Sequence, residues 1–342
     1  MRHLLIAFII TTAFILTASC SSGGGGGDLD PLTTGVSINA ANAEAVGATV
    51  VNSVDTALGV SIGSNFVTGV MVIPSPSEFN YPEFIVSLLN ELGNSSGQPN
   101  NGGVAGVVIP PTTYPCTDLG GTSGTYTESG NISSPPDLNA GDTISVTFTN
   151  CVIFGVTLNG TMGMTITQIT PLFTGIPPFT LGINVVLTGF SVNDAGLVIT
   201  ANGDMSILLD EDGLNNHSME LSGNSLTATA AGDTEILSNY LFDLSGNDIS
   251  GDYSIDLQGT IASTVIGGSV TFVTTTTFTG NDFVGTTEPT AGVLWITTSI
   301  DNSQEWLIAQ PDGINVQIDV DEDGDNIVDA TIMTTWTALY AQ

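Results

Sequence analysis

Apolar and polar residues alternate along most of the chain after residue 143. Ile144, Val146 and Phe148, for example, are separated by serine and threonine. The same period of two returns in 156–167, 181–187, 253–257 and 314–318. This alternation predicts β-strands that bury one face and leave the other, here rich in threonine, in water.

Turn-forming sequences separate these segments, for example Asn139–Asp142, Asn193–Gly196 and Asp210–Gly213. About a dozen strands follow one another without a long helical insert, which favours an antiparallel meander. A sheet of this size must curl, close or split into two layers. We therefore expect a mainly β fold with one large, curved, half-barrel-like antiparallel sheet.

Two earlier segments have helical patterns. Residues 39–58 are rich in alanine, and Val46, Val50, Val54 and Leu58 recur at four-residue spacing on one face. Either Asn39 or Asn42 is expected to cap this helix, and Gly59 to end it. Pro82–Leu92 is the second candidate, followed by Gly93.

We expect one or both of these helices to pack against the concave face of the sheet. This order of elements is similar in outline to periplasmic lipoprotein carriers, in which helices plug an apolar half-barrel. The stretch 94–115, punctuated by Asn-Gly and Pro-Pro pairs, is expected to be a loop, with 104–109 the only short strand candidate.

The first 34 residues have a different character. Arg2 and His3 precede an apolar run from Leu4 to Leu16, too short for a membrane span and typical of a secretory signal. The sequence Leu16-Thr17-Ala18-Ser19-Cys20 resembles the lipobox of bacterial lipoproteins, which implies acylation of Cys20. Residues 23–27 are all glycine and read as a flexible tether. Because Ser21 stands where aspartate would favour inner-membrane retention, the resemblance implies an outer-membrane location.

These patterns divide the chain into four parts. They are a signal peptide at 1–19, an acylated Cys20 and tether at 20–34, a helical segment and loop at 35–115, and an antiparallel β domain at 116–342.

The charge balance is extreme. The chain has 34 acidic residues and a single Lys or Arg, Arg2, so its formal net charge is −33. A surface of this kind lacks the cations that bind phosphate backbones or anionic lipid headgroups, which excludes both as direct partners. Charged residues are only 10% of the chain and hydrophobic residues 41%, which predicts a folded protein despite the charge.

Two cysteines remain after Cys20. In an oxidising compartment, Cys116 and Cys151 are most simply paired as a disulfide, which would stabilise the fold by roughly 3 to 4 kcal/mol.

The sharpest local motif lies near the C-terminus, at 319–329. It places aspartates at alternate positions before Gly324 and resembles the DxDxDG calcium loops of EF-hands, dockerins and thrombospondin type 3 repeats. The flanks look like strands, and Ala330 occupies the position of the bidentate glutamate of an EF-hand. Two interpretations stay open: a solvated acidic hairpin turn, or a structural calcium site. The candidate calcium ligands are Asp319, Asp321, Asp323, Asp325 and Asp329.

Catalytic signals are weak. Gly93–Gly97 matches G-x-S-x-G, but a helical pattern precedes it where a nucleophile elbow needs a strand. A Ser-His-Asp triad would have to use His217, and a carboxylate hydrolase would need two buried acids in a cleft. The three tryptophans, Trp295, Trp306 and Trp336, are expected to pack within hairpins rather than form a sugar platform.

We therefore predict a protein that is not an enzyme. It is expected to be held by its lipid anchor at the outer membrane or cell surface, with a structural, adhesive or ligand-binding role. The alternative is a periplasmic carrier of lipids or other hydrophobic molecules, since methionines such as Met162, Met164 and Met205 suit adaptable apolar surfaces. A carrier requires an open apolar cavity in the sheet.

Overall fold

The computed structural model describes residues 32, 34–62, 107–119, 121–133, 138–153, 155–170, 178–194, 197–281 and 288–341. The predicted signal peptide with Cys20, the helix candidate Pro82–Leu92 and the Gly93–Gly97 pattern lie outside these residues. Among the described helices, none is long and apolar enough to span a membrane.

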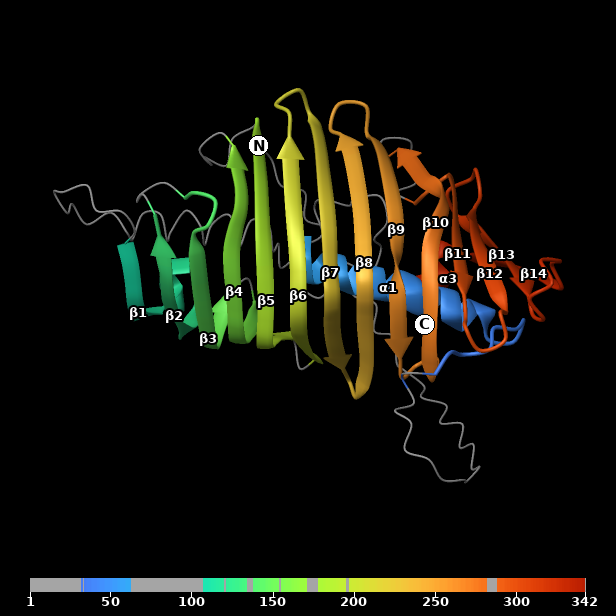
Figure 1. Ribbon diagram of the computed structural model, residues 1–342, viewed down its shortest axis with the longest axis horizontal. Helices are drawn as coiled ribbons and strands as arrows, with labels where there is room; N and C mark the ends of the chain where they lie inside the picture. The colour runs from blue at the N-terminus through green and yellow to red at the C-terminus, as the bar shows by residue number, and fades with distance from the viewer. Residues whose placement is uncertain are drawn as a thin grey trace.

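The chain forms one sheet of fourteen strands in sequence order, from β1 at one edge to β14 at the other (Figure 1). The pairing between neighbouring strands is antiparallel throughout. The predicted large antiparallel meander is therefore confirmed, and the sheet is open. The strands are β1 Val107–Pro115, β2 Ser123–Ile132, β3 Thr143–Ile153, β4 Val156–Thr170, β5 Phe179–Asp194, β6 Leu197–Glu211, β7 Asn216–Ala230, β8 Asp233–Asn247, β9 Asp252–Ser263, β10 Gly268–Asn281, β11 Ala291–Thr297, β12 Gln304–Ala309, β13 Asn315–Asp321 and β14 Ala330–Thr335.

Within the described residues, strand β1 corrects the expected loop over 107–115, and its first three residues fall in the strand candidate 104–109. Pro110 and Pro111 are turn signals in the sequence, yet both lie within the strand. An edge strand tolerates proline because one side of it has no neighbour to receive an N–H. The register also shifts between Ile109 and Thr112, so the two prolines sit at an irregularity of the ladder.

The alternation of the sequence sorts the side chains between the two faces. Ile144, Val146 and Phe148 are buried on what we call the inner face, and the residues between them are more exposed. The three methionines that suggested an adaptable surface, Met162, Met164 and Met205, are at most 3% exposed and belong to this core. The apolar core therefore runs along the inner face, and the serine- and threonine-rich face is the outer one.

Helix α1, Ala43–Ile62, lies across the inner face and contacts β7, β9 and β13 (Figure 1). Val46, Val50 and Val54 are buried, as the four-residue spacing predicts. The Asn39 side chain accepts the N–H of Ala41 just before the helix. The helix continues past Gly59, where we expected it to end.

The C-terminal end of the chain packs against α1 through a short helix, α3 (Trp336–Tyr340), which follows β14. The remaining element, the 3-10 helix η2 (Cys116–Leu119), follows β1. Trp295 and Trp306 are cross-strand partners in the β11–β12 hairpin, as expected. Trp336 instead belongs to α3, where its ring stacks on Tyr340 at a centroid distance of 6.3 Å.

Candidate functional site

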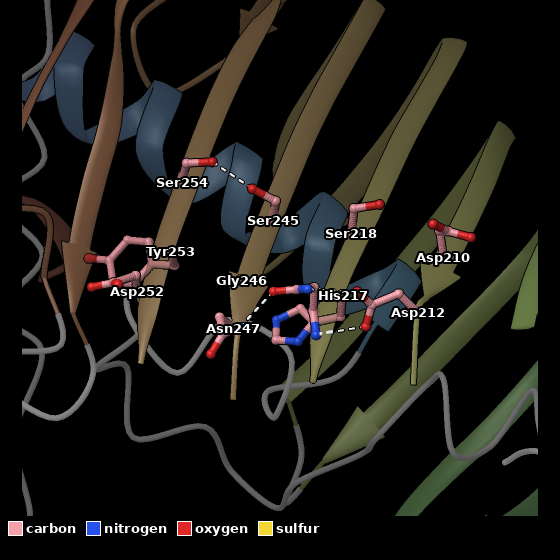
Figure 2. Close-up of a pocket in the computed structure, with 11 residues that line it drawn as sticks. Asp210, Asp212, His217, Ser218, Ser245, Gly246, Asn247, Asp252, Tyr253 and Ser254 are labelled. Carbon is pink, nitrogen blue, oxygen red and sulfur yellow. Dashed lines mark hydrogen bonds between the residues drawn. The ribbon is translucent and has the colours of Figure 1, made fainter. Parts of the chain in front are cut away.

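A pocket of about 480 Å³ lies at one end of the central strands β6 to β9, beside the turns that connect them (Figure 2). Four residues that are cross-strand partners line it as one row on the outer face: Asp210, Ser218, Ser245 and Ser254. The Ser245 and Ser254 hydroxyls are hydrogen-bonded at 2.7 Å. Ser218 and Ser245 are far apart in the sequence, and each of the other two neighbouring pairs is separated by a turn. The register of the strands places all four side by side.

The next row supplies two rings to the same pocket. His217, Gly246 and Tyr253 are partners across β7, β8 and β9, and Tyr253 is paired with Gly280 of β10. A Cβ on Gly246 would lie 2.4 Å from His217 Nε2, and a Cβ on Gly280 would lie 2.1 Å from the Tyr253 hydroxyl oxygen. Each ring therefore leans over the glycine on the neighbouring strand, which no larger residue would allow.

The rim of the pocket is formed by the turns at the strand ends, and hydrogen bonds between side chains hold these turns in place. The Asp212 carboxylate accepts a hydrogen bond from Asn216 Nδ2 at 2.6 Å, and the side-chain oxygen Oδ1 of Asn216 accepts one from Asn247 Nδ2 at 2.6 Å (Figure 2). Asn247 Oδ1 in turn accepts the backbone N–H groups of Ile249 and Ser250. This chain of amides links the β6–β7 turn to the turn after β8, so the rim is preorganised.

The electrostatics of the pocket follow from these bonds. Hydrogen bonds, chiefly from Asn216, hold the pKa of Asp212 below its usual range, and the Asn281 amide does the same for the pKa of Asp252. Burial raises the pKa of Glu211, and its attraction to His217 partly opposes this. His217 Nδ1 lies 3.3 Å from Asp248 Oδ1. The Asp212 and Asp252 carboxylates therefore stay ionised well into the acid range, and the pocket is negative.

The arrangement offers binding groups rather than a nucleophile with its base. Ser218 follows His217 directly in a strand, so the two side chains alternate between opposite faces. The Ser245 hydroxyl is already bonded to that of Ser254. What the pocket presents is a set of carboxylate and amide oxygens, hydroxyls and one tyrosine ring.

A second pocket, of about 490 Å³, lies over the middle of β5 to β8. There the Tyr240 hydroxyl donates to the backbone oxygen of Asp204 at 2.9 Å, passing over Gly223. Burial, together with the nearby Asp204 charge, raises the pKa of Tyr240. Asn224, Asn239 and Ser222 contribute polar groups to its lining.

The predicted calcium loop is the turn between β13 and β14, and the structure divides its five aspartates. One carboxylate oxygen from each of Asp321, Asp323 and Asp325 lies within 4.8 Å of the others. Asp319 instead accepts hydrogen bonds from Gln317 and Thr331, and Asp329 accepts the N–H of Glu322. The three clustered aspartates are the residues that could hold a cation here.

Asp321 also organises the turn itself. One of its oxygens accepts the N–H of Gly324 at 2.8 Å, and the other accepts Asn326 N–H and Gln304 Nε2, both at 2.7 Å. Burial alone would raise the pKa of Asp321, but these hydrogen bonds outweigh it and the pKa is lowered. Glycine at 324 fits because its φ is +75°.

The predicted disulfide is present. Cys116 and Cys151 are bonded, both are buried, and they link η2 to β3 near the β1 edge of the sheet.

Sequence reasoning considered parts of the pocket but not the whole. In the sequence, Asp210–Gly213 indicates a turn, and His217 is the histidine that a triad would have to use. The acids and amides of the rim come from four strands, so no local motif could have revealed them.

Comparisons of the chain with protein-family models, curated proteins and solved structures found no match. The function must therefore be argued from the site.

Proposed function

We propose that this protein is a non-catalytic binding protein for neutral, hydroxyl-rich ligands such as saccharides, held at the outer membrane by acylated Cys20. The observation that carries the proposal is the lining of the pocket at the ends of β6 to β9. It combines ionised carboxylates, amides and hydroxyls with a tyrosine ring, on a preorganised rim.

The charge of the pocket narrows the ligand class. Asp210, Asp212 and Asp252 repel anions, and the chain has no Lys or Arg beyond Arg2 to compensate. Carboxylate and amide oxygens accept hydrogen bonds from sugar hydroxyls, and the amide and serine groups donate to them. Tyr253 precedes Ser254 in β9, so its ring lines the same pocket from the inner face, where it packs in part against the core.

The alternative of a hydrophobic carrier has less support. Met162 and Met164 are buried in the core, and most of the residues that line the two described pockets are polar. An apolar ligand would have to displace these side chains.

The test is a titration of the full protein with a panel of neutral oligosaccharides, followed by NMR and calorimetry. Ser218→Tyr fills the outer-face row with a residue that strands accommodate well. It is expected to weaken binding at least tenfold. The matched control, Thr227→Tyr, lies on the same strand outside both pocket linings and is expected to bind like wild type. Equal binding by both variants, or no binding of any saccharide at millimolar concentration, would contradict the proposal.

The anchor is tested separately. Cys20→Ser removes the thiol that would be acylated, so the protein is expected to move from the membrane fraction to the soluble extracytoplasmic fraction. Retention of this variant in the membrane would argue against lipid anchoring.

A further inference from the structure

Glu305 is the most unusual side chain in the described part of the chain. It lies on the inner face of β12 with no exposed surface, and neither of its carboxylate oxygens has a hydrogen-bond partner. An isolated ionised carboxylate in such a place is very costly, and the usual response is to take up a proton. Burial accordingly raises the pKa of Glu305 well above its ordinary value of 4.5.

The surroundings of Glu305 are the interface between the sheet and helix α1. Its cross-strand partners are Ile296 and Val320, both fully buried. Across the interface stands Gly47 of α1: a Cβ at this position would lie 3.4 Å from Glu305 Oε1 and 3.1 Å from Leu307. Glycine at position 47 therefore lets the backbone of α1 lie close to the buried carboxyl.

Other acidic groups touch α1 but have partners. Glu44 accepts the Thr334 hydroxyl at 2.6 Å, and Glu235 accepts the Ser53 hydroxyl at 2.8 Å. Glu288 accepts the Tyr340 hydroxyl of α3 at 3.2 Å. His217 and Tyr253 stand at the far ends of β7 and β9, and Asp319 and Asp321 point to the outer face of β13. The part of the chain that the structure describes contains no Lys or Arg, so within it a proton is the available means of neutralising Glu305.

From this geometry we propose that helix α1 is a proton-dependent element, docked on the inner face while Glu305 is protonated and loosened when Glu305 ionises. Ionisation places a charge among Ile296, Val320 and Leu307, and the charge reaches water if the helix moves away. The device thus holds the core closed in acid and relaxes it as the pH rises. Glu305 and α1 lie on the inner face of the sheet, whereas the serine row of the proposed ligand pocket lies on the outer face. The proton-dependent movement therefore does not depend on the ligand.

The experiment is hydrogen–deuterium exchange of the full protein between pH 5 and pH 9, with rates corrected for the chemical exchange rate at each pH. One linked proton changes an equilibrium by up to about tenfold per pH unit. Protection of the α1 amides is therefore expected to fall by up to about tenfold per unit above the titration of Glu305. Protection of β5, at a distance from α1, is expected to stay constant.

Glu305→Gln keeps the shape of the side chain without the titration, and α1 protection in this variant is expected to lose most of its pH dependence. Glu235 also touches α1 and burial raises its pKa, but its carboxylate accepts the Ser53 hydroxyl. Glu235→Gln is therefore the matched control, and it is expected to keep most of the wild-type pH dependence. If Glu305→Gln does not fold, Glu305→Met serves in its place. The proposal is overturned if α1 protection in wild type is constant with pH, if β5 loses protection together with α1, or if removal of the Glu305 carboxyl leaves the pH dependence unchanged.

Discussion

Glu305 and Asp321 lie on neighbouring strands, β12 and β13, and both are fully buried, but they occupy opposite faces of the sheet. On the outer face, Asp321 accepts hydrogen bonds from backbone N–H groups of its own turn and from Gln304. On the inner face, Glu305 faces apolar side chains and Gly47. The pKa is lowered at Asp321 and raised at Glu305.

The contrast shows how a chain almost without Lys and Arg accommodates buried acids. One way is to surround the carboxylate with backbone donors, which a tight turn with glycine provides. The other is to keep the carboxyl protonated. Substitutions at the two positions should therefore change the free energy of unfolding in opposite directions.

The largest effect is expected for Asp321→Ala. It leaves the N–H groups of the turn and Gln304 without their acceptor, and we expect the free energy of unfolding to fall by about 3 kcal/mol. Urea denaturation at pH 7 measures this. The exposed neighbour gives the control: Asp323→Ala should change stability by no more than about 0.5 kcal/mol. Similar losses in the two variants would show that Asp321 has no special role in the turn.

Glu305→Met should have the opposite sign. Methionine is unbranched like glutamate and replaces an unpaired carboxyl with an apolar group at a buried site. We expect the free energy of unfolding at pH 8 to rise by about 2 kcal/mol in urea titrations. A variant less stable than wild type would mean that the carboxyl makes a favourable interaction in the folded protein.

The two groups also predict opposite pH dependences. The folded-state pKa of Glu305 is raised, so its contribution is complete below its ordinary value of 4.5 and is lost as the pH rises through the raised pKa. The folded-state pKa of Asp321 is lowered, so its contribution is complete above 3.8 and is lost as the pH falls. Stability of wild type minus that of Glu305→Met should decline above pH 4.5 by at most about 1.4 kcal/mol per pH unit. The subtraction removes the general repulsion among the surface acids, and a flat difference would contradict the assignment.

The addition of calcium is expected to have the smallest effect on the free energy of unfolding. A loop that binds with a dissociation constant of about 1 mM would gain about 1 kcal/mol in 5 mM calcium. Thermal unfolding with and without calcium measures the gain, and the double variant Asp323→Asn, Asp325→Asn should abolish it while Asp319→Asn should not. No shift in wild type would leave the turn as a solvated hairpin stabilised by Asp321 alone.

Much of the fold followed from local patterns. The alternation of Ile144, Val146 and Phe148 predicts which face is buried, because a strand exposes successive side chains on opposite sides. Spacing also identifies the buried stripe of α1. Strand β1 extends beyond the predicted candidate 104–109 to Pro115, because proline usually breaks a strand and the position at the sheet edge that makes it tolerable is not visible locally.

The candidate site was less accessible. The acidic loop could be read directly, since its aspartates lie within a few residues of one another. The pocket could not, because His217, Gly246 and Tyr253 come from three strands and meet only through their register. The residues that neighbour Glu305 in the sequence also do not distinguish this buried glutamate from the exposed acidic residues.

The sequence by itself determined the strand period, the single anchoring cysteine candidate, the disulfide partners and a surface without basic residues, because each depends on residue type or near neighbours. The tertiary structure decided which three loop aspartates converge, which residues build the pocket, and that Asp321 gains donors while Glu305 has none. These outcomes depend on which strands and which helix are placed together, and burial and hydrogen bonding arise only from that placement.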